Sequence, residues 1–140
     1  MTLFTRRLAL VALMIFGLAA VAPHGADART VTFTPATYNK LLKSGKPFMI
    51  GVHTKWCTTC AAQKRVIRSL RRSGKPYANL TVLEMDWDKY RGSKIGKQLR
   101  IPRRSTLVMY SGGREVGRII AGTGTGSIKR LINKGYKGGA

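Results

Sequence analysis

The stretch Trp56-Cys57-Thr58-Thr59-Cys60 decides the fold, because it contains both cysteines of this 140-residue chain. Residues 47–53 are mostly apolar and partly β-branched, which predicts a buried strand before the stretch. Apolar residues at helical spacing follow it up to Gly74 and predict a helix. Cys57 is therefore expected at a helix N-terminus, where free backbone N–H groups and the helix dipole stabilise a thiolate. Because thiolates attack disulfides, the stretch predicts a reactive dithiol.

The order of strand, Trp-Cys-x-x-Cys and helix resembles the thioredoxin superfamily, and residues 56–60 match its motif residue for residue. The resemblance covers most of the chain after residue 29. It implies a thiol–disulfide oxidoreductase without a cofactor, acting on protein disulfides or dithiols. In that enzyme Cys57 is the attacking thiol, Cys60 the resolving thiol, and the two form a redox disulfide.

The rest of the chain predicts one thioredoxin-like α/β domain over residues 29–140, with a central mixed β-sheet flanked by helices in the order βαβαβαββα. Val31 and Phe33 indicate a first strand. Thr34-Pro35 is typical of a helix start, and Gly45 of its end. The later elements are expected at residues 80–86 (strand), 93–99 (short helix), 106–110 and 115–121 (hairpin), and from a Ser127 cap to Gly135 (last helix).

Residues 1–28 predict a cleaved export signal. Arg6 and Arg7 precede the apolar run of residues 8–22, and Ala26-Asp27-Ala28 fits a small-x-small cleavage site. The alternative is an uncleaved anchor, but an apolar run of fifteen residues is short for a bilayer span. We expect a periplasmic protein. By resemblance, such exported domains often act as reductants supplied by a membrane electron donor, although Thr58-Thr59 does not decide the direction.

The chain is strongly basic, with a net charge of +21. Removing residues 1–28 takes away two of 26 basic and one of five acidic residues, which leaves +20. This charge favours acidic partners and an anionic membrane surface. Nucleic acid is not an expected partner, because the basic runs lack interleaved aromatic residues. We expect a monomer. The basic residues expected near the dithiol, or else on a merely solvated face, are Lys64, Arg65, Arg68, Arg71, Arg72, Arg91, Lys94, Lys97, Arg100, Arg103 and Arg104.

Ser105, followed by Thr106, stands where thioredoxins carry a cis-proline beside the dithiol. A cis bond before serine would cost ~3 kcal/mol, so Ser105 is either trans in a reshaped loop or held under strain. A loop shift that brings Pro102 to the site is the disfavoured alternative. We expect wider access to the dithiol and a Ser105→Pro variant that folds but has a changed redox potential or a changed rate of mixed-disulfide release. The opposing expectation is a trans Ser105 whose replacement costs stability.

A second departure concerns the carboxylate that thioredoxins bury under the dithiol. Gly51 occupies that position, and Glu84 matches its partner lysine. One hypothesis places the carboxylate on the neighbouring strand, with Glu84 directed into the space beside Gly51. The alternative is that Glu84, Asp86 and Asp88 alternate along one strand face and pair with basic side chains.

His53, Lys55 and Trp56 are further candidates for tuning the dithiol. A protonated His53 or the charge of Lys55 would favour the Cys57 thiolate. The alternative for His53 is a half-buried strand-end residue bonded to a backbone carbonyl. A different class of function is a non-catalytic zinc or copper module that uses His53 with both cysteines. No fourth ligand is evident in the sequence, so no metal is assigned to the site.

Overall fold

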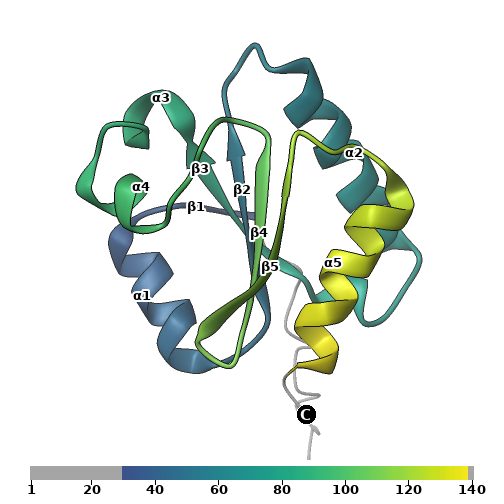
Figure 1. Ribbon diagram of the computed structural model, residues 1–140. Helices are drawn as coiled ribbons and strands as arrows, with labels where there is room; N and C mark the ends of the chain where they lie inside the picture. The colour runs from purple at the N-terminus through teal and green to yellow at the C-terminus, as the bar shows by residue number, and fades with distance from the viewer. Residues whose placement is uncertain (1–29, 139–140) are drawn as a thin grey trace, which may run out of the picture.

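The computed structural model describes residues 30–138, in which five strands form one mixed sheet in the order β1-β3-β2-β4-β5 (Figure 1). The predicted export signal lies outside the described residues. Strands β1, β3 and β2 run parallel, whereas β4 is antiparallel to β2 and β5 to β4. The strands are β1 (Thr30–Thr32), β2 (Phe48–His53), β3 (Thr81–Asp86), β4 (Thr106–Ser111) and β5 (Arg114–Ile120).

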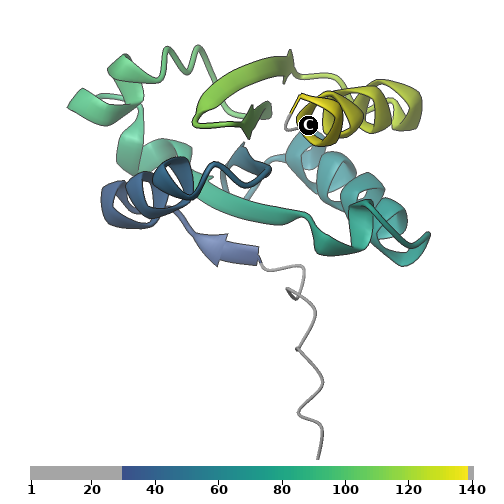
Figure 2. The same cartoon turned by 90° about the horizontal axis from the view of Figure 1, so that it is seen from below.

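Helices cover both faces of this sheet. The helices are α1 (Pro35–Ser44), α2 (Thr58–Arg72), η1 (Tyr77–Asn79, one 3-10 turn), α3 (Trp87–Tyr90), α4 (Lys94–Gln98) and α5 (Thr125–Lys137). In Figures 1 and 2, α1, α3 and α4 lie on one side of the sheet and α2 and α5 on the other. This arrangement confirms the predicted thioredoxin-like α/β fold with a central mixed sheet.

Alternate residues of β2 point to opposite faces, which divides the core into two clusters. Phe48, Ile50 and Val52 pack with residues of the α1 side. Met49 packs with Ile67 of α2 and with other residues of the α2 and α5 side. The same alternation places Gly51 beneath α2, the helix that carries the cysteines.

Local capping signals set the ends of α1 and α2 as predicted. The Thr34 side chain accepts a hydrogen bond from the Thr37 N–H at the start of α1, and Gly45 ends that helix with φ of +66°. Cys57 is the N-cap of α2. Gly74 follows the end of α2 with φ of +100°, so the predicted helix stop is confirmed.

Two predictions about helices were wrong. Helix α5 starts after Gly124 without a side-chain cap, so Ser127 lies in its first turn. Gly135 lies inside this helix rather than at its end. The residue is glycine because a Cβ there would collide with Met109 of β4. Glycine at this position allows close packing of helix on sheet.

The helix α3 was not predicted. The Asp86 carboxylate accepts hydrogen bonds from the N–H groups of Asp88 and Lys89, which starts a helix directly after β3. Asp88 therefore lies in a helix and not on the strand face where it was expected.

Within residues 30–138, the structure contains no helix with the length and apolarity needed to cross a membrane.

Candidate active site

A disulfide joins Cys57 and Cys60 at the N-terminus of α2, beyond the end of β2. The Cys57 Sγ accepts a hydrogen bond from the Cys60 N–H at 3.1 Å, because this N–H has no partner inside the helix. Cys57 is 7% exposed and Cys60 4%. The predicted placement of Cys57 at a helix N-terminus is confirmed, and its sulfur occupies the position where the helix favours negative charge.

Ser105 lies directly against both sulfurs. Its Oγ is 3.1 Å from the Cys57 Sγ and 3.2 Å from the Cys60 Sγ. Since neither sulfur of a disulfide carries a proton, the hydroxyl is the donor in this state. Ser105 is 1% exposed, so a residue remote in sequence forms a buried contact with the disulfide.

The Arg104–Ser105 peptide is trans, and Ser105 has φ of +63°. The Ser105 N–H donates to the Val52 carbonyl at 2.8 Å, and the Ser105 carbonyl accepts from the Ala121 N–H at 2.9 Å. The loop is therefore reshaped around a trans serine, the first of the two predicted alternatives. Pro102 is exposed, so the alternative loop shift is wrong.

This geometry argues against the expectation that Ser105→Pro leaves the fold intact. Proline requires φ near −65° and has no N–H for the Val52 carbonyl. The opposing expectation, a loss of stability, fits the observed backbone. The neighbouring Thr106 is fully buried, and its hydroxyl donates to the Arg103 carbonyl at 2.7 Å, which makes Thr106 a support of the loop.

Gln63 supports the same loop, a role that the sequence did not predict. Its Nε2 donates to the carbonyls of Ser105 and Gly122, both at 2.9 Å, and the side chain is 2% exposed. Both amide N–H groups are thus used to hold the Ser105 loop against α2. A polar residue within the buried stripe of α2, between Cys60 and Ile67, was the signal that could have identified it.

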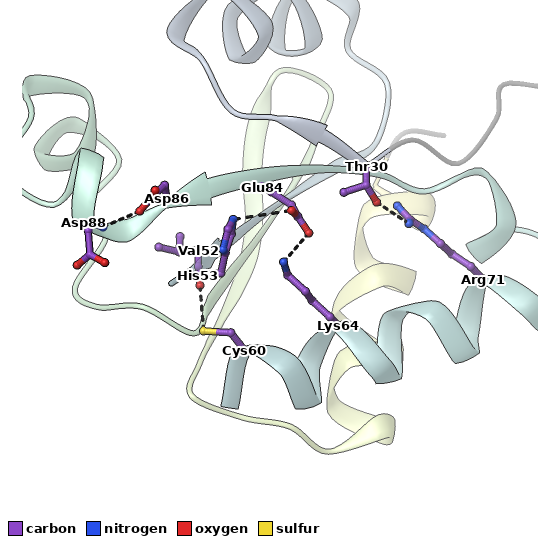
Figure 3. Close-up of polar contacts among 9 residues, drawn as sticks. All are labelled: Thr30, Val52, His53, Cys60, Lys64, Arg71, Glu84, Asp86 and Asp88. Atoms are coloured by element: carbon purple, nitrogen blue, oxygen red, sulfur yellow. Dashed lines mark hydrogen bonds and ion pairs between the residues drawn. The ribbon is translucent and has the colours of Figure 1, made fainter. Parts of the chain in front are cut away.

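Glu84 lies beside Gly51 in the register of β2 and β3. Its carboxylate is 2.8 Å from the Lys64 Nζ and 3.8 Å from the His53 Nε2 (Figure 3). A cavity of about 20 Å³ is lined by Gly51, Cys60 and Glu84 among other residues. This volume suits one water molecule. Glu84 thus both pairs with a basic side chain and lines a cavity shared with Cys60, so each of the two hypotheses for it has an observation behind it.

His53 is half-buried at the end of β2, and it faces the Glu84 carboxylate rather than a backbone carbonyl. Burial and, next, the charge of Lys64 lower the pKa of His53, against weaker opposing effects of Glu84 and Asp86. A lowered pKa leaves His53 neutral at neutral pH. It therefore contributes little positive charge to the dithiol.

Trp56 and Arg104 form the exposed rim of the site. Trp56 is 65% exposed, and the Arg104 guanidinium lies 4.4 Å from the centre of its ring. The predicted proximity of Arg104 to the dithiol motif is confirmed. Lys55, next to Trp56, is exposed. The rim thus combines an aromatic surface with positive charge.

The structure brings no support for the metal-binding alternative. Within the described part of the chain, no three His, Cys, Asp or Glu side chains are grouped in a way that could hold a metal ion. His53 and the two cysteines thus do not form the ligand set that this alternative requires.

The chain is similar to thioredoxins in sequence and in structure. The Thioredoxin family model matches residues 29–134. Thioredoxin-2 of Saccharomyces cerevisiae is 26% identical over 96 residues, which cover 68% of this chain and 86% of that protein. The crystal structure of Trxlp from Edwardsiella tarda EIB202 is 26% identical with a TM-score of 0.65, and the match covers 74% of this chain and 98% of that one.

Mitochondrial thioredoxin 3 of Saccharomyces cerevisiae, in its oxidized form, shares the fold at 20% identity with a TM-score of 0.62. That match covers 74% of this chain and 93% of the yeast chain. The family match spans most of the chain and includes the paired cysteines. This chain belongs to the thioredoxin family, and with its Cys57–Cys60 pair it is a thiol–disulfide oxidoreductase.

Proposed function

We propose that the protein is an exported oxidoreductase that reduces protein disulfides, with Cys57 as the attacking thiol and Cys60 as the resolving thiol. The observation that carries this assignment is the hydrogen bond from the Cys60 N–H to the Cys57 Sγ. It gives Cys57, and not Cys60, a helix-terminal donor for its thiolate. Cys57 is also the more exposed of the two cysteines.

The reaction has two exchange steps. The Cys57 thiolate attacks one sulfur of a substrate disulfide, forms a mixed disulfide, and releases the other substrate sulfur as a thiolate that takes up a proton. Cys60 then loses its proton and attacks the Cys57 Sγ, which closes the Cys57–Cys60 disulfide and releases the second substrate thiolate. The substrate gains two electrons and the dithiol loses two. A membrane-bound dithiol donor would return them.

Glu84 is proposed to receive the Cys60 proton. Its carboxylate and Cys60 line one cavity with room for a single water, which could carry the proton between them. The Lys64 ammonium at 2.8 Å orients the carboxylate from α2 (Figure 3). Lys55 is proposed to favour the Cys57 thiolate by its positive charge, whereas His53, neutral at neutral pH, is given no such role.

The proposed partners follow from the rim and the charge. Trp56 and Arg104 offer an aromatic and positive surface to an acidic segment of a substrate protein. The net charge of +20 without residues 1–28 favours proximity to an anionic membrane surface, where an electron donor would lie. The leader-like residues 1–28 are the support for a periplasmic location, and we propose a monomer.

Insulin reduction with dithiothreitol tests the assignment of the cysteines. Wild type should accelerate the reaction, and Cys57→Ser should reduce the rate to that of dithiothreitol alone. Cys60→Ser should instead accumulate a mixed disulfide at Cys57, visible as an adduct by mass spectrometry. An adduct that forms only on Cys60, in Cys57→Ser, would reverse the roles. An equilibrium with glutathione tests the direction, and a strongly oxidising potential would contradict reduction.

Glu84→Gln tests the proton acceptor. This variant keeps the shape of the side chain and removes its charge, so the mixed disulfide at Cys57 should persist longer than in wild type at neutral pH. We expect release to slow by at least about tenfold, since a positioned general base typically contributes about 10²–10⁴-fold. Glu115→Gln serves as the control, because Glu115 pairs with Arg118 on β5. Equal release rates in wild type and Glu84→Gln would exclude this role.

A further inference from the structure

The Ser105 hydroxyl has an unusual set of partners. Within residues 30–138 its hydrogen-bond partners are the two sulfurs, at 3.1 Å from Cys57 and 3.2 Å from Cys60. The side chain is 1% exposed, so bulk water does not reach it. Disulfide sulfurs are weak acceptors, and a buried hydroxyl that has only weak acceptors is poorly satisfied.

Reduction of the disulfide changes this balance. A thiolate is an ionised acceptor, and hydrogen bonds to ionised groups are about twice as strong as those between neutral groups. The hydrogen bond from the hydroxyl is therefore strongest when one of the two sulfurs carries negative charge. It should stabilise the reduced, anionic dithiol relative to the disulfide.

We propose that the Ser105 hydroxyl is a catalytic group that donates its hydrogen bond to whichever sulfur carries the negative charge during thiol–disulfide exchange. This inference rests on the proposed function. Before exchange, the hydroxyl donates to the Cys57 thiolate. After Cys57 has formed a mixed disulfide, the charge lies on deprotonated Cys60, and the same hydroxyl donates to that sulfur. No electron or proton leaves the serine in either step.

The geometry allows this transfer with almost no movement. The two O···S distances differ by only a tenth of an ångström, so rotation of the O–H bond redirects the donor from one sulfur to the other. The backbone of Ser105 is held by the Val52 carbonyl and by the Gln63 amide. A proline at this position has no hydroxyl and would leave both sulfurs without this donor.

The cost of the arrangement supports a chemical role. Ser105 has φ of +63°, a backbone conformation that residues other than glycine rarely adopt. Glycine would relieve this strain, but it would remove the hydroxyl. Serine at this position thus has a backbone cost that glycine would avoid, and its hydroxyl is the group that contacts both sulfurs.

Two variants separate the hydroxyl from the backbone. Both Ser105→Ala and Ser105→Gly remove the donor, but alanine retains the positive-φ strain and glycine relieves it. Ser111→Ala is the matched control, because Ser111 is also 1% exposed, lies at the far end of β4, and has a hydroxyl without a partner among the described residues.

The measurements are the pH dependence of iodoacetamide alkylation of the reduced protein and the equilibrium with glutathione. We expect both Ser105 variants to shift the Cys57 titration upward by about one unit, a tenfold loss of thiolate. The glutathione equilibrium should move about tenfold toward the oxidised protein, which corresponds to about 30 mV. Ser111→Ala should match wild type.

The outcomes distinguish this inference from the proposed function. Unchanged titration and potential in both Ser105 variants would overturn the role of the hydroxyl, even with an active wild type. A shift in only one variant would also overturn it, because the cause would then be the backbone. A wild type that does not reduce insulin would overturn the proposed function instead.

Discussion

The two ends of β4 both need a backbone with positive φ, but they use different residues for it. After β4, the hairpin turn has Gly112 at φ of +59° and Gly113 at +74°. Before β4, Ser105 adopts +63°. Glycine makes the turn without steric cost, as is usual in two-residue hairpins. Serine does not, and its left-handed backbone costs about 1 to 2 kcal/mol.

The difference shows what each end of the strand is for. At the turn only the backbone conformation matters, and a Cβ on Gly112 would meet no atom within 4 Å. At the dithiol end, a side chain is needed as well as a conformation, because the hydroxyl contacts both sulfurs. Strain is thus kept at the site and avoided at the turn.

The largest expected effect comes from Ser105→Pro. Its ring excludes φ of +63°, and the Val52 carbonyl loses the N–H that bonds it at 2.8 Å. We expect a loss of about 3 kcal/mol in the free energy of unfolding, measured by urea denaturation. A variant as stable as wild type would show that the loop can change to the proline conformation, and the contrast between the two ends of β4 would disappear.

Gln63→Leu should have the next largest effect. Leucine fills a similar volume but leaves the carbonyls of Ser105 and Gly122 without their side-chain donor. The expected cost is about 2 kcal/mol in the free energy of unfolding. The Ser105 loop should also loosen, so the equilibrium with glutathione should shift together with stability. Lost stability at an unchanged potential would mean that Gln63 supports the fold but not the position of the hydroxyl.

Gly112→Ala tests the turn end of β4. The added methyl group has free space, so the cost comes only from the positive φ and should be about 1 kcal/mol. Thermal unfolding would detect this loss. Insulin reduction and the glutathione equilibrium should not change, and a changed potential would contradict the separation of the two ends.

The smallest expected effect is a pH dependence of stability that arises from His53, at the end of β2. Burial, followed by Lys64, lowers the pKa of His53 below its ordinary 6.5. The unfolded chain therefore binds this proton more readily than the folded protein, and stability should fall as the pH drops through about 6.5 and below. The side chain retains 22% exposure, which keeps the effect small.

His53→Gln provides the comparison for that pH effect. Urea denaturation of the variant from about pH 7 to about pH 5 should show a weaker dependence of stability on pH than wild type. Gly112→Ala should keep the wild-type dependence. A steeper dependence in His53→Gln would mean that the folded protein binds the His53 proton more tightly than the unfolded chain.

Short-range patterns predicted the fold because capping and turn preferences act within a few residues. The Thr34-Pro35 pair and Gly45 set the ends of α1, and Cys57 starts α2. The paired glycines between β4 and β5 form the predicted hairpin turn. The same rules failed for Gly135, because glycine is needed there for close packing against Met109 of β4 and not to end the helix.

The sequence predicted the cysteines of the candidate site, but it did not predict the role of Gln63 or the backbone conformation of Ser105. Trp56-Cys57 and Cys60 are neighbours in sequence, so their spacing alone placed them at one helix start. Gln63 gave a weaker indication, a polar residue in a buried stripe. The sequence left a trans Ser105 as one of two alternatives but did not indicate its positive φ, because that conformation depends on Val52 and Ala121 in other parts of the chain.

The sequence by itself determined the reactive dithiol, the strand before it and the helix behind it, since these depend on interactions between near neighbours. Only the tertiary structure decided what surrounds the sulfurs. The Ser105 hydroxyl reaches Cys57 across 48 positions of chain and Gln63 reaches Ser105 across 42, and the sheet order places Glu84 beside Gly51. Such contacts arise from how strands pair and helices pack, which a local pattern does not encode.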